Sequence, residues 1–188
     1  MQFPPVDAPK QSHGHAVADA LAGSAAGLAL GRLGSLASRI ASVQGTDVPG
    51  PFVRPRVVVV AGKHGVAARG VSAWTEDAGD VQAEQLRAGG GPAHAAARLA
   101  GATVRFIGDY LDAPTGAIDV EPATSPEVFD AALAAGAEVA DNEIDSGADL
   151  IIPGDIGVGN TTVAAAVYGV FTRTEPVKAI GRGSGIND

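Results

Sequence analysis

The chain has 188 residues, of which 46% are hydrophobic, so it is long enough to bury a core and too apolar for a disordered protein. Its 13 basic and 21 acidic residues give a net charge of −8 with no run of Lys or Arg, so we expect neither nucleic acid nor an anionic membrane as a partner. The absence of cysteine excludes disulfides and thiolate chemistry, and we expect a soluble, cytoplasmic protein.

The first 50 residues read as an N-terminal arm followed by helices. Prolines at positions 4, 5 and 9 keep residues 1–13 irregular. Leucines and an isoleucine recur near helical spacing between His15 and Val43, and Gly31 predicts a break in that helix. Residues 45–55 resemble a linker, so we place a domain boundary near residue 50 and expect residues 51–188 to form an α/β domain.

Strand and helix patterns alternate through residues 51–188. Four successive valines predict a strand at 57–62 that is buried on both faces, as in parallel sheets. Further strands are expected at 102–107, 148–152 and 177–180, and 109–125 reads as irregular. Helices are expected at about 80–99, from Pro126 with Ser125 as its N-cap, and through Val170. This order predicts a doubly wound, mainly parallel sheet.

Three glycine-rich loops follow predicted strands, after Val60, Ile152 and Ile180. Ligands of doubly wound sheets bind beyond the carboxyl ends of the strands. The sequence therefore predicts a binding site at this edge of the sheet.

The stretch from Gly147 to Tyr168 (GADLIIPGDIGVGNTTVAAAVY) carries the strongest site signal. A strand, a glycine-dense turn and a helix N-terminus capped by Asn-Thr-Thr form an arrangement that binds phosphate through backbone N–H groups. The alternative is a tight turn with no ligand. The stretch lacks the lysine of a P-loop at Asn160 and the third glycine of a dinucleotide fingerprint at Thr162.

Two side chains near these loops have two interpretations each. His64 follows a predicted strand and could act as a base or phosphate ligand, or only bond the backbone. Asp155 could contact a ribose hydroxyl or stabilise positive charge on a sugar carbon, or only form an Asx turn. A solvated helix face explains the acidic residues Asp141, Glu143 and Asp145. No metal site or catalytic triad is recognisable, so the residues alone predict binding of a phosphorylated small molecule.

Several longer stretches resemble one family. They are RVVVVAGKHGVAARGVSAW (56–74), GATVR (101–105), VADNEIDSGADLIIPGDIGVGNTTVAAA (139–166) and GRGSGIND (181–188). Gly31-Arg32-Leu33 and Val43-Gln44-Gly45 match as well. The chain is similar from about Pro4 to Asp188 to the nicotinate-nucleotide:dimethylbenzimidazole phosphoribosyltransferases of cobalamin lower-ligand synthesis.

The resemblance implies a Rossmann-like domain, a homodimer, no cofactor or metal, and transfer of phosphoribose from nicotinate mononucleotide to 5,6-dimethylbenzimidazole. It implies that Asp155 lies beside the ribose, where the family usually has a glutamate, and that His64, Ser72 and Trp74 contribute to the base pocket. The phosphoribosyl phosphate would be held by six residues: Gly157, Gly159, Asn160, Thr161, Thr162 and Gly183.

The sequence also departs from the family pattern. Lys63 stands where the family has the aspartate of Asp-His-Gly, and the Thr-x-Gln-Met pattern after Trp74 is lost. The family also has a second stretch with a glutamate proposed as general base, so we expect a truncated member with an incomplete sheet and a possible second chain supplying the rest. The alternatives are a non-catalytic nucleotide-binding or regulatory remnant of the same fold, and an unrelated structural α/β module.

Overall fold

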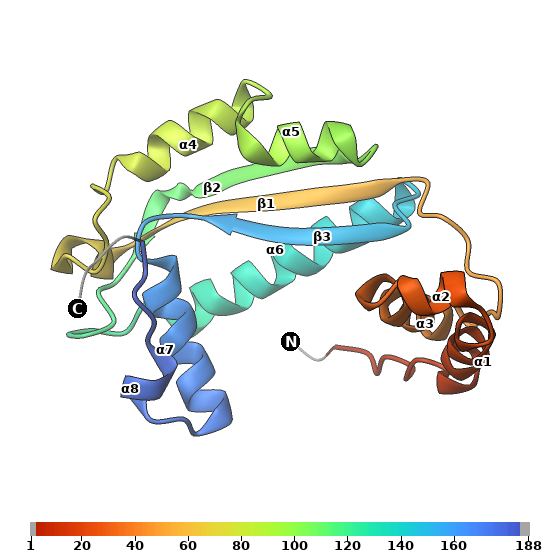
Figure 1. The fold of residues 1–188 in the computed structure, drawn as a ribbon. Coiled ribbons are helices and arrows are strands. Elements are labelled where there is room, and N and C mark those ends of the chain that lie inside the picture. Colours follow the sequence, from red (N-terminus) through yellow and green to blue (C-terminus); the bar gives the residue numbers. More distant parts are fainter. Residues whose placement is uncertain (1–2, 185–188) are drawn as a thin grey trace. The chain divides into compact units, whose positions relative to one another are not determined.

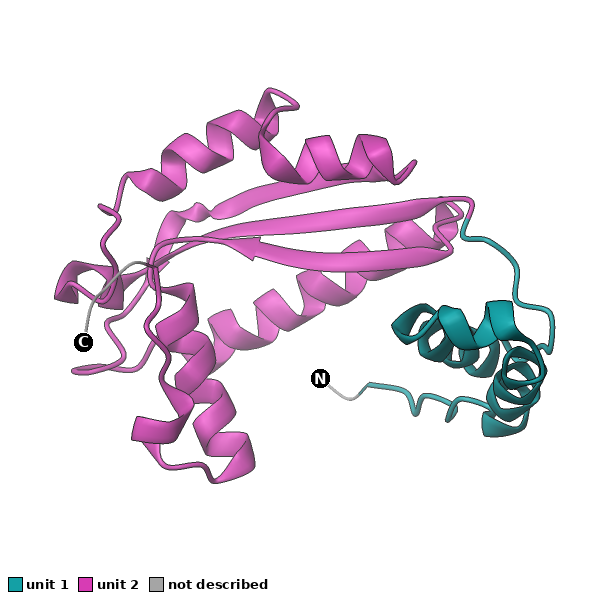
Figure 2. Ribbon diagram, viewed as in Figure 1, with its two compact units in different colours: residues 1–52 teal, residues 53–188 magenta. Residues whose placement is uncertain are grey.

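The computed structural model describes residues 3–184, and the chain forms two compact units, residues 1–52 and 53–188 (Figure 2). The first unit is helical, with α1 (Gln11–Ala22), α2 (Ala25–Ala29) and α3 (Arg32–Gln44). The break predicted at Gly31 is confirmed between α2 and α3, and a second break, which was not predicted, lies at Gly23-Ser24. Gly31 has φ +50°, which glycine adopts more readily than other residues.

The second unit is built on a parallel sheet of three strands in the order β2-β1-β3 (Figure 1). These strands are β1 (Pro55–His64), β2 (Thr103–Thr115) and β3 (Leu150–Ile156). Val57 of the central strand is in register with Val104 on one side and with Ile152 on the other. The predicted α/β class and parallel sheet are confirmed.

Helices cover both faces of the sheet (Figure 1). The connection from β1 to β2 contains α4 (Ala78–Arg87) and α5 (Gly91–Leu99), which pack on one face. The connection from β2 to β3 is α6 (Pro126–Asp145), which crosses the other face. As predicted, the Ser125 hydroxyl caps α6 by accepting the Val128 N–H at 3.3 Å. Crossing from one face to the other makes the sheet doubly wound.

The most deeply buried apolar cluster is small and lies between the sheet and α4. Ala61 of β1 and Ala83 of α4 are fully buried, and Leu111 of β2 packs with them. Phe106 and Ile156 flank this cluster. The small alanine side chains at this contact let α4 lie close to the sheet. Only 4% of the residues in the chain are aromatic.

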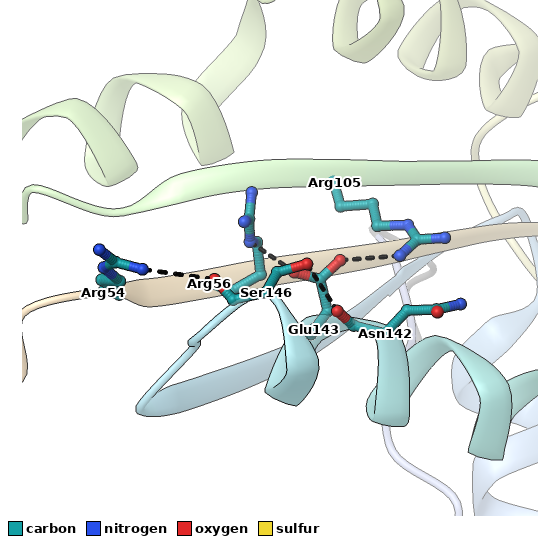
Figure 3. Close-up of polar contacts among 6 residues, drawn as sticks. All are labelled: Arg54, Arg56, Arg105, Asn142, Glu143 and Ser146. Atoms are coloured by element: carbon teal, nitrogen blue, oxygen red, sulfur yellow. Dashed lines mark hydrogen bonds and ion pairs between the residues drawn. The ribbon is translucent and has the colours of Figure 1, made fainter.

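The amino ends of β1 and β2 are joined to α6 by a buried carboxylate (Figure 3). Glu143 is only 3% exposed, and it pairs with Arg56 Nε at 2.6 Å and with Arg105 Nη1 at 2.8 Å. The expectation of a solvated acidic face is wrong for Glu143, although Asp141 and Asp145 are exposed. Helical spacing alone did not reveal that Glu143 faces two arginines on neighbouring strands.

Three predicted elements differ in the structure. The expected helix at 80–99 is split, because Gly89 and Gly91 adopt positive φ where α4 ends and α5 begins, with Pro92 in the first turn of α5. β2 runs on through Thr115, with Tyr110 and Thr115 paired to β1, so part of 109–125 is strand. The expected strand at 177–180 is a short helix, α8 (Pro176–Ala179).

The reason for the α8 result is local. Pro176 occupies the first helical turn, and Lys178 pairs with Glu175 at 3.1 Å across one turn, so a helix satisfies both residues.

The preceding helix, α7 (Asn160–Thr172), buries none of its residues, and its Val170 and Phe171 are 77% and 85% exposed. In the part of the chain that the structure describes, no helix has the length and apolar character needed to cross a membrane.

Candidate functional site

The carboxyl ends of β1 and β3 lie side by side, which brings the focal glycine-rich stretch next to His64. Val60 is in register with Asp155, and Ala61 with Ile156. The sequence suggested that Asp155 lies in a loop, but β3 continues through Gly154-Asp155-Ile156. Pro153 is tolerated there because β3 is an edge strand of the described sheet. Asp155 therefore has a fixed position at the end of a strand.

The N-terminus of α7 follows β3 after three residues and is left without a side-chain cap. Its N-cap is Gly159, whose φ of +88° lies in the left-handed region. The prediction that Asn160, Thr161 and Thr162 cap this helix is wrong, because no side chain caps it and the Asn160 amide donates to the Asp155 carboxylate instead. Backbone N–H groups of an uncapped first turn are available to an anion.

Two close approaches explain the glycines of this turn. A Cβ on Gly157 would collide with the carbonyl oxygen of Gly62 and would lie 2.5 Å from Asn160 Oδ1. A Cβ on Gly159 would lie 3.3 Å from Val66 Cγ1, in the short helix Gly65–Arg69 that follows β1. The glycines therefore let the backbone after β3 pack directly against the end of β1.

His64 ends β1 and is half-buried beside Asn160 and Asp155. Burial lowers the pKa of His64 below 6.5, and the neighbouring Asn160 and Asp155 only partly offset this effect. The imidazole is therefore neutral at pH 7. Among the described residues, His64 Nδ1 and Asn160 Oδ1 are buried with no hydrogen-bond partner, so this end of the sheet keeps polar groups that a ligand could satisfy.

An apolar cavity of about 580 Å³ opens at this edge of the sheet. Its polar groups include His64, Asp155 and Asn160, and its apolar wall includes Tyr110 of β2 and Phe129 of α6. A cavity of this size and lining suits a small aromatic ligand. Sequence reasoning missed Tyr110 and Phe129, although the aromatic at the fourth position of α6 was a usable signal.

Lys63 precedes His64 at the end of β1, and its side chain extends toward α4. Its Nζ lies 2.9 Å from Asp80 Oδ2 on α4, and it lines both the large cavity and a neighbouring cavity of about 280 Å³. The smaller cavity also includes Glu76 and Val158. In the sequence, Lys63 stood out only as a departure from the Asp-His-Gly pattern of the family, and its pairing with Asp80 was not predicted.

The remaining predicted site residues form a second group near the first turn of α7. A Cβ on Gly183 would lie 3.6 Å from Thr161 Oγ1, and Ala73 N–H donates to the Ser184 carbonyl at 3.2 Å. The Ser72 hydroxyl accepts the Trp74 N–H at 3.2 Å, and Trp74 is 61% exposed. Neither Ser72 nor Trp74 lines the large cavity formed by the described residues, so their role in a base pocket stays a prediction.

The glycine loop after Ile180 follows the helix α8 and no strand, yet its described part still returns to α7. The last four residues of the GRGSGIND motif, 185–188, lie outside the described residues. Within residues 3–184, no cluster of three or more His, Asp or Glu side chains could hold a metal ion.

Comparison with known proteins places this geometry in context. A statistical model of the family described as Phosphoribosyltransferase matches residues 4–188. The nicotinate-nucleotide–dimethylbenzimidazole phosphoribosyltransferase of Corynebacterium efficiens is 47% identical over 169 residues, which is 85% of this chain and 46% of that protein. The enzyme of the same name from Mycobacterium leprae is 39% identical over all of this chain and 58% of its own length.

A solved structure agrees with the sequence comparison. The crystal structure of CobT from Thermus thermophilus superposes with a TM-score of 0.81 and 32% sequence identity, over 94% of this chain and 57% of that one. The chain thus spans about half the length of the relatives it matches.

Proposed function

The chain belongs to the phosphoribosyltransferase family, and we propose that it binds nicotinate mononucleotide for transfer of its phosphoribosyl group to 5,6-dimethylbenzimidazole. The products would be α-ribazole 5′-phosphate and nicotinate, a step in cobalamin lower-ligand synthesis. In the reaction, the bond between the sugar C1′ and the nicotinate nitrogen breaks, and a bond from C1′ to a benzimidazole nitrogen forms.

The observation that carries the proposal is the uncapped N-terminus of α7 beside an apolar cavity. Gly157 and Gly159 let the backbone approach a ligand, and Thr161 and Thr162 add hydroxyl groups in the first turn. With Asn160 and Gly183, these residues would hold the phosphate of the donor, which the helix dipole also favours.

Asp155 is suited to the sugar end of the same ligand. Positive charge develops at C1′ as the nicotinate leaves, and a carboxylate fixed at the end of β3 would stabilise it. The Asn160 amide holds this carboxylate in place.

The cavity lined by Tyr110 and Phe129 would receive the aromatic base, with the neutral His64 at its polar side. The resemblance assigns Ser72 and Trp74 to the same pocket, although neither residue lines this cavity as the described residues form it. The benzimidazole ring must lose its N–H proton as the new bond forms, and the resemblance assigns that step to a glutamate in the stretch of the relatives that this chain does not match.

Donor binding is tested by thermal unfolding. Nicotinate mononucleotide at 100 times its Kd should stabilise the chain by about 2.7 kcal/mol and raise Tm. Ribose 5-phosphate should give a smaller rise, because it fills only the phosphate and sugar sites. No change in Tm at saturating nucleotide would contradict the proposal.

A second candidate is a non-catalytic nucleotide-binding or regulatory protein of the same fold. It is favoured by Lys63, which stands where the resemblance implies an aspartate and which pairs with Asp80. Formation of α-ribazole phosphate from nicotinate mononucleotide and dimethylbenzimidazole separates the two candidates, because turnover by the 188-residue chain would rule out the second.

Partners form the last part of the proposal. We expect small-molecule substrates and a homodimer, with a second polypeptide as an alternative partner. The exposed apolar residues of α7, with Phe171 at 85%, support a covered surface. Sedimentation equilibrium of the purified chain measures the oligomeric state, and a monomer at all concentrations would contradict the homodimer.

A further inference from the structure

Lys63 lies where two cavities meet at the end of β1. One cavity contains His64, Asp155 and Asn160, and the other contains Glu76. The Lys63 side chain is 37% exposed and its partner Asp80 is 47% exposed. An ion pair this accessible to water contributes little to folding, so the lysine can exchange Asp80 for another anion at small cost.

The charges around these cavities make Lys63 important for an anionic ligand. Asp155 and Glu76 are acidic, and burial keeps the pKa of His64 low, so the imidazole carries no charge at pH 7. Among the described residues lining the two cavities, Lys63 is the one side chain with a positive charge at that pH. Without Lys63, the charged side chains that face a ligand carboxylate there would all be negative.

We propose that Lys63 determines specificity for an acidic pyridine nucleotide: on binding, its ammonium leaves Asp80 and pairs with the carboxylate of the pyridine ring. This inference rests on the proposed function, which supplies the donor. The phosphate is assigned to the first turn of α7, and Lys63 extends from β1 toward α4, so the two anionic groups of one nucleotide would use separate cations and donors. A ring that carries a neutral amide offers no charge to the lysine.

The test compares two nucleotides that differ only in this group, nicotinate mononucleotide and nicotinamide mononucleotide. Calorimetry gives the Kd of each for the 188-residue chain and its variants at pH 7. A charge-assisted contact predicts that the chain binds the acid on the order of 10-fold more tightly than the amide. Lys63→Met should abolish this preference by weakening the acid alone, and Asp80→Asn should tighten the acid by freeing the lysine.

Lys178→Met is the matched control, because Lys178 also pairs with a nearby carboxylate, that of Glu175, but lies on α8 away from both cavities. It should leave both Kd values unchanged. Circular dichroism checks that Lys63→Met is folded, and if it is not, Asp80→Asn and the charge-retaining Lys63→Arg carry the test.

The outcomes are distinct. Equal weakening of both nucleotides by Lys63→Met, or an unchanged preference for the acid, would overturn the assignment of the carboxylate to Lys63. Equal affinity of the unaltered chain for both nucleotides would also overturn it. If the unaltered chain binds neither nucleotide, the proposed function fails and this inference fails with it.

Discussion

The two ends of β1 use charged side chains in opposite ways. At the amino end, Arg56 and the neighbouring Arg105 each form an ion pair with one oxygen of the buried Glu143 carboxylate, although the contact from Arg56 to Oε2 lacks hydrogen-bond geometry (Figure 3). At the carboxyl end, Lys63 pairs with the partly exposed Asp80, and His64 Nδ1 is buried without a hydrogen-bond partner among the described residues. One end is closed by internal pairing, and the other keeps capacity for a ligand.

This difference follows from what each end must do. A buried charge is tolerated only where partners replace its water, and Glu143 has two. Unpaired buried polar atoms such as His64 Nδ1 reduce stability, so their presence at the carboxyl end indicates a group that a ligand completes. The comparison predicts that substitutions at the amino end lower stability and that substitutions at the carboxyl end change binding.

Glu143→Ala should have the largest effect on stability. It leaves Arg56 and Arg105 without their shared carboxylate, and loss of one partner from a buried ion pair costs about 3–5 kcal/mol. Because the two arginine side chains are 29% and 39% exposed and can reach water, we expect about 3 kcal/mol. Urea unfolding gives the value. Asp141→Ala, an exposed carboxylate on the same helix, is the control, and equal losses for the two variants would contradict the comparison.

Gly157→Ala should have the largest effect on binding. The new methyl group would collide with the Gly62 carbonyl and push the first turn of α7 away from β1. We expect a loss of at least about 10-fold in affinity for nicotinate mononucleotide, a difference of about 1.4 kcal/mol. Gly136→Ala is the control, because no heavy atom lies within 4 Å of its Cβ position and alanine favours the α6 helix. Unchanged affinity in Gly157→Ala would show that the turn does not hold the donor.

The fold was largely predictable because its signals are local. Four valines mark β1, and Ser125-Pro126 mark the start of α6. The continuation of β2 through Tyr110 to Thr115 was not predictable in this way, because it depends on pairing with Gly62 and His64. The short helix α8 was missed because valine and isoleucine near Pro176 suggested a strand more strongly than one turn suggested a helix.

The candidate site was predictable in its residue types and less so in its contacts. The glycines, Asn160 and Asp155 could be singled out from the sequence. The hydrogen bond from Asn160 to Asp155 was not foreseen, because Asn160 was expected to cap α7. Glu143 was assigned to the solvent because its arginine partners come from β1 and β2, 87 and 38 residues earlier in the chain for Arg56 and Arg105. Contacts between a helix and strands that are far apart in the sequence leave no periodic signal.

His64 should give the carboxyl end a dependence on pH. Because burial lowers its pKa in the folded chain, the unfolded chain binds a proton first as pH falls below about 6.5, the ordinary value. Stability from this group is therefore present above pH 6.5 and is lost as the pH falls toward the folded pKa. Thermal unfolding at pH 7.5 and 5.5 measures this effect, and His64→Gln should remove that part of the difference in Tm between the two pH values. The same pH dependence in both proteins would contradict the buried, neutral imidazole.

Asp149→Asn should have the smallest effect, and it tests whether burial or pairing makes the amino end stable. The Asp149 carboxylate accepts hydrogen bonds from the N–H groups of Val53 at 2.6 Å and Arg54 at 2.9 Å. These bonds lower the pKa of Asp149, and the bond from Val53 has the largest effect. Asp149 lies at the same end of the sheet as Glu143 but is exposed to water, so water can replace the lost bonds. At pH 7 the urea midpoint should fall far less than in Glu143→Ala.

The contribution of the Asp149 carboxylate to stability is present above the ordinary carboxyl pKa and is lost as the pH falls through the lower pKa of the folded chain. Asp149→Asn should therefore flatten the decrease in Tm between pH 5 and 3. A midpoint shift as large as that of Glu143→Ala would show that pairing stabilises this end of the sheet without burial.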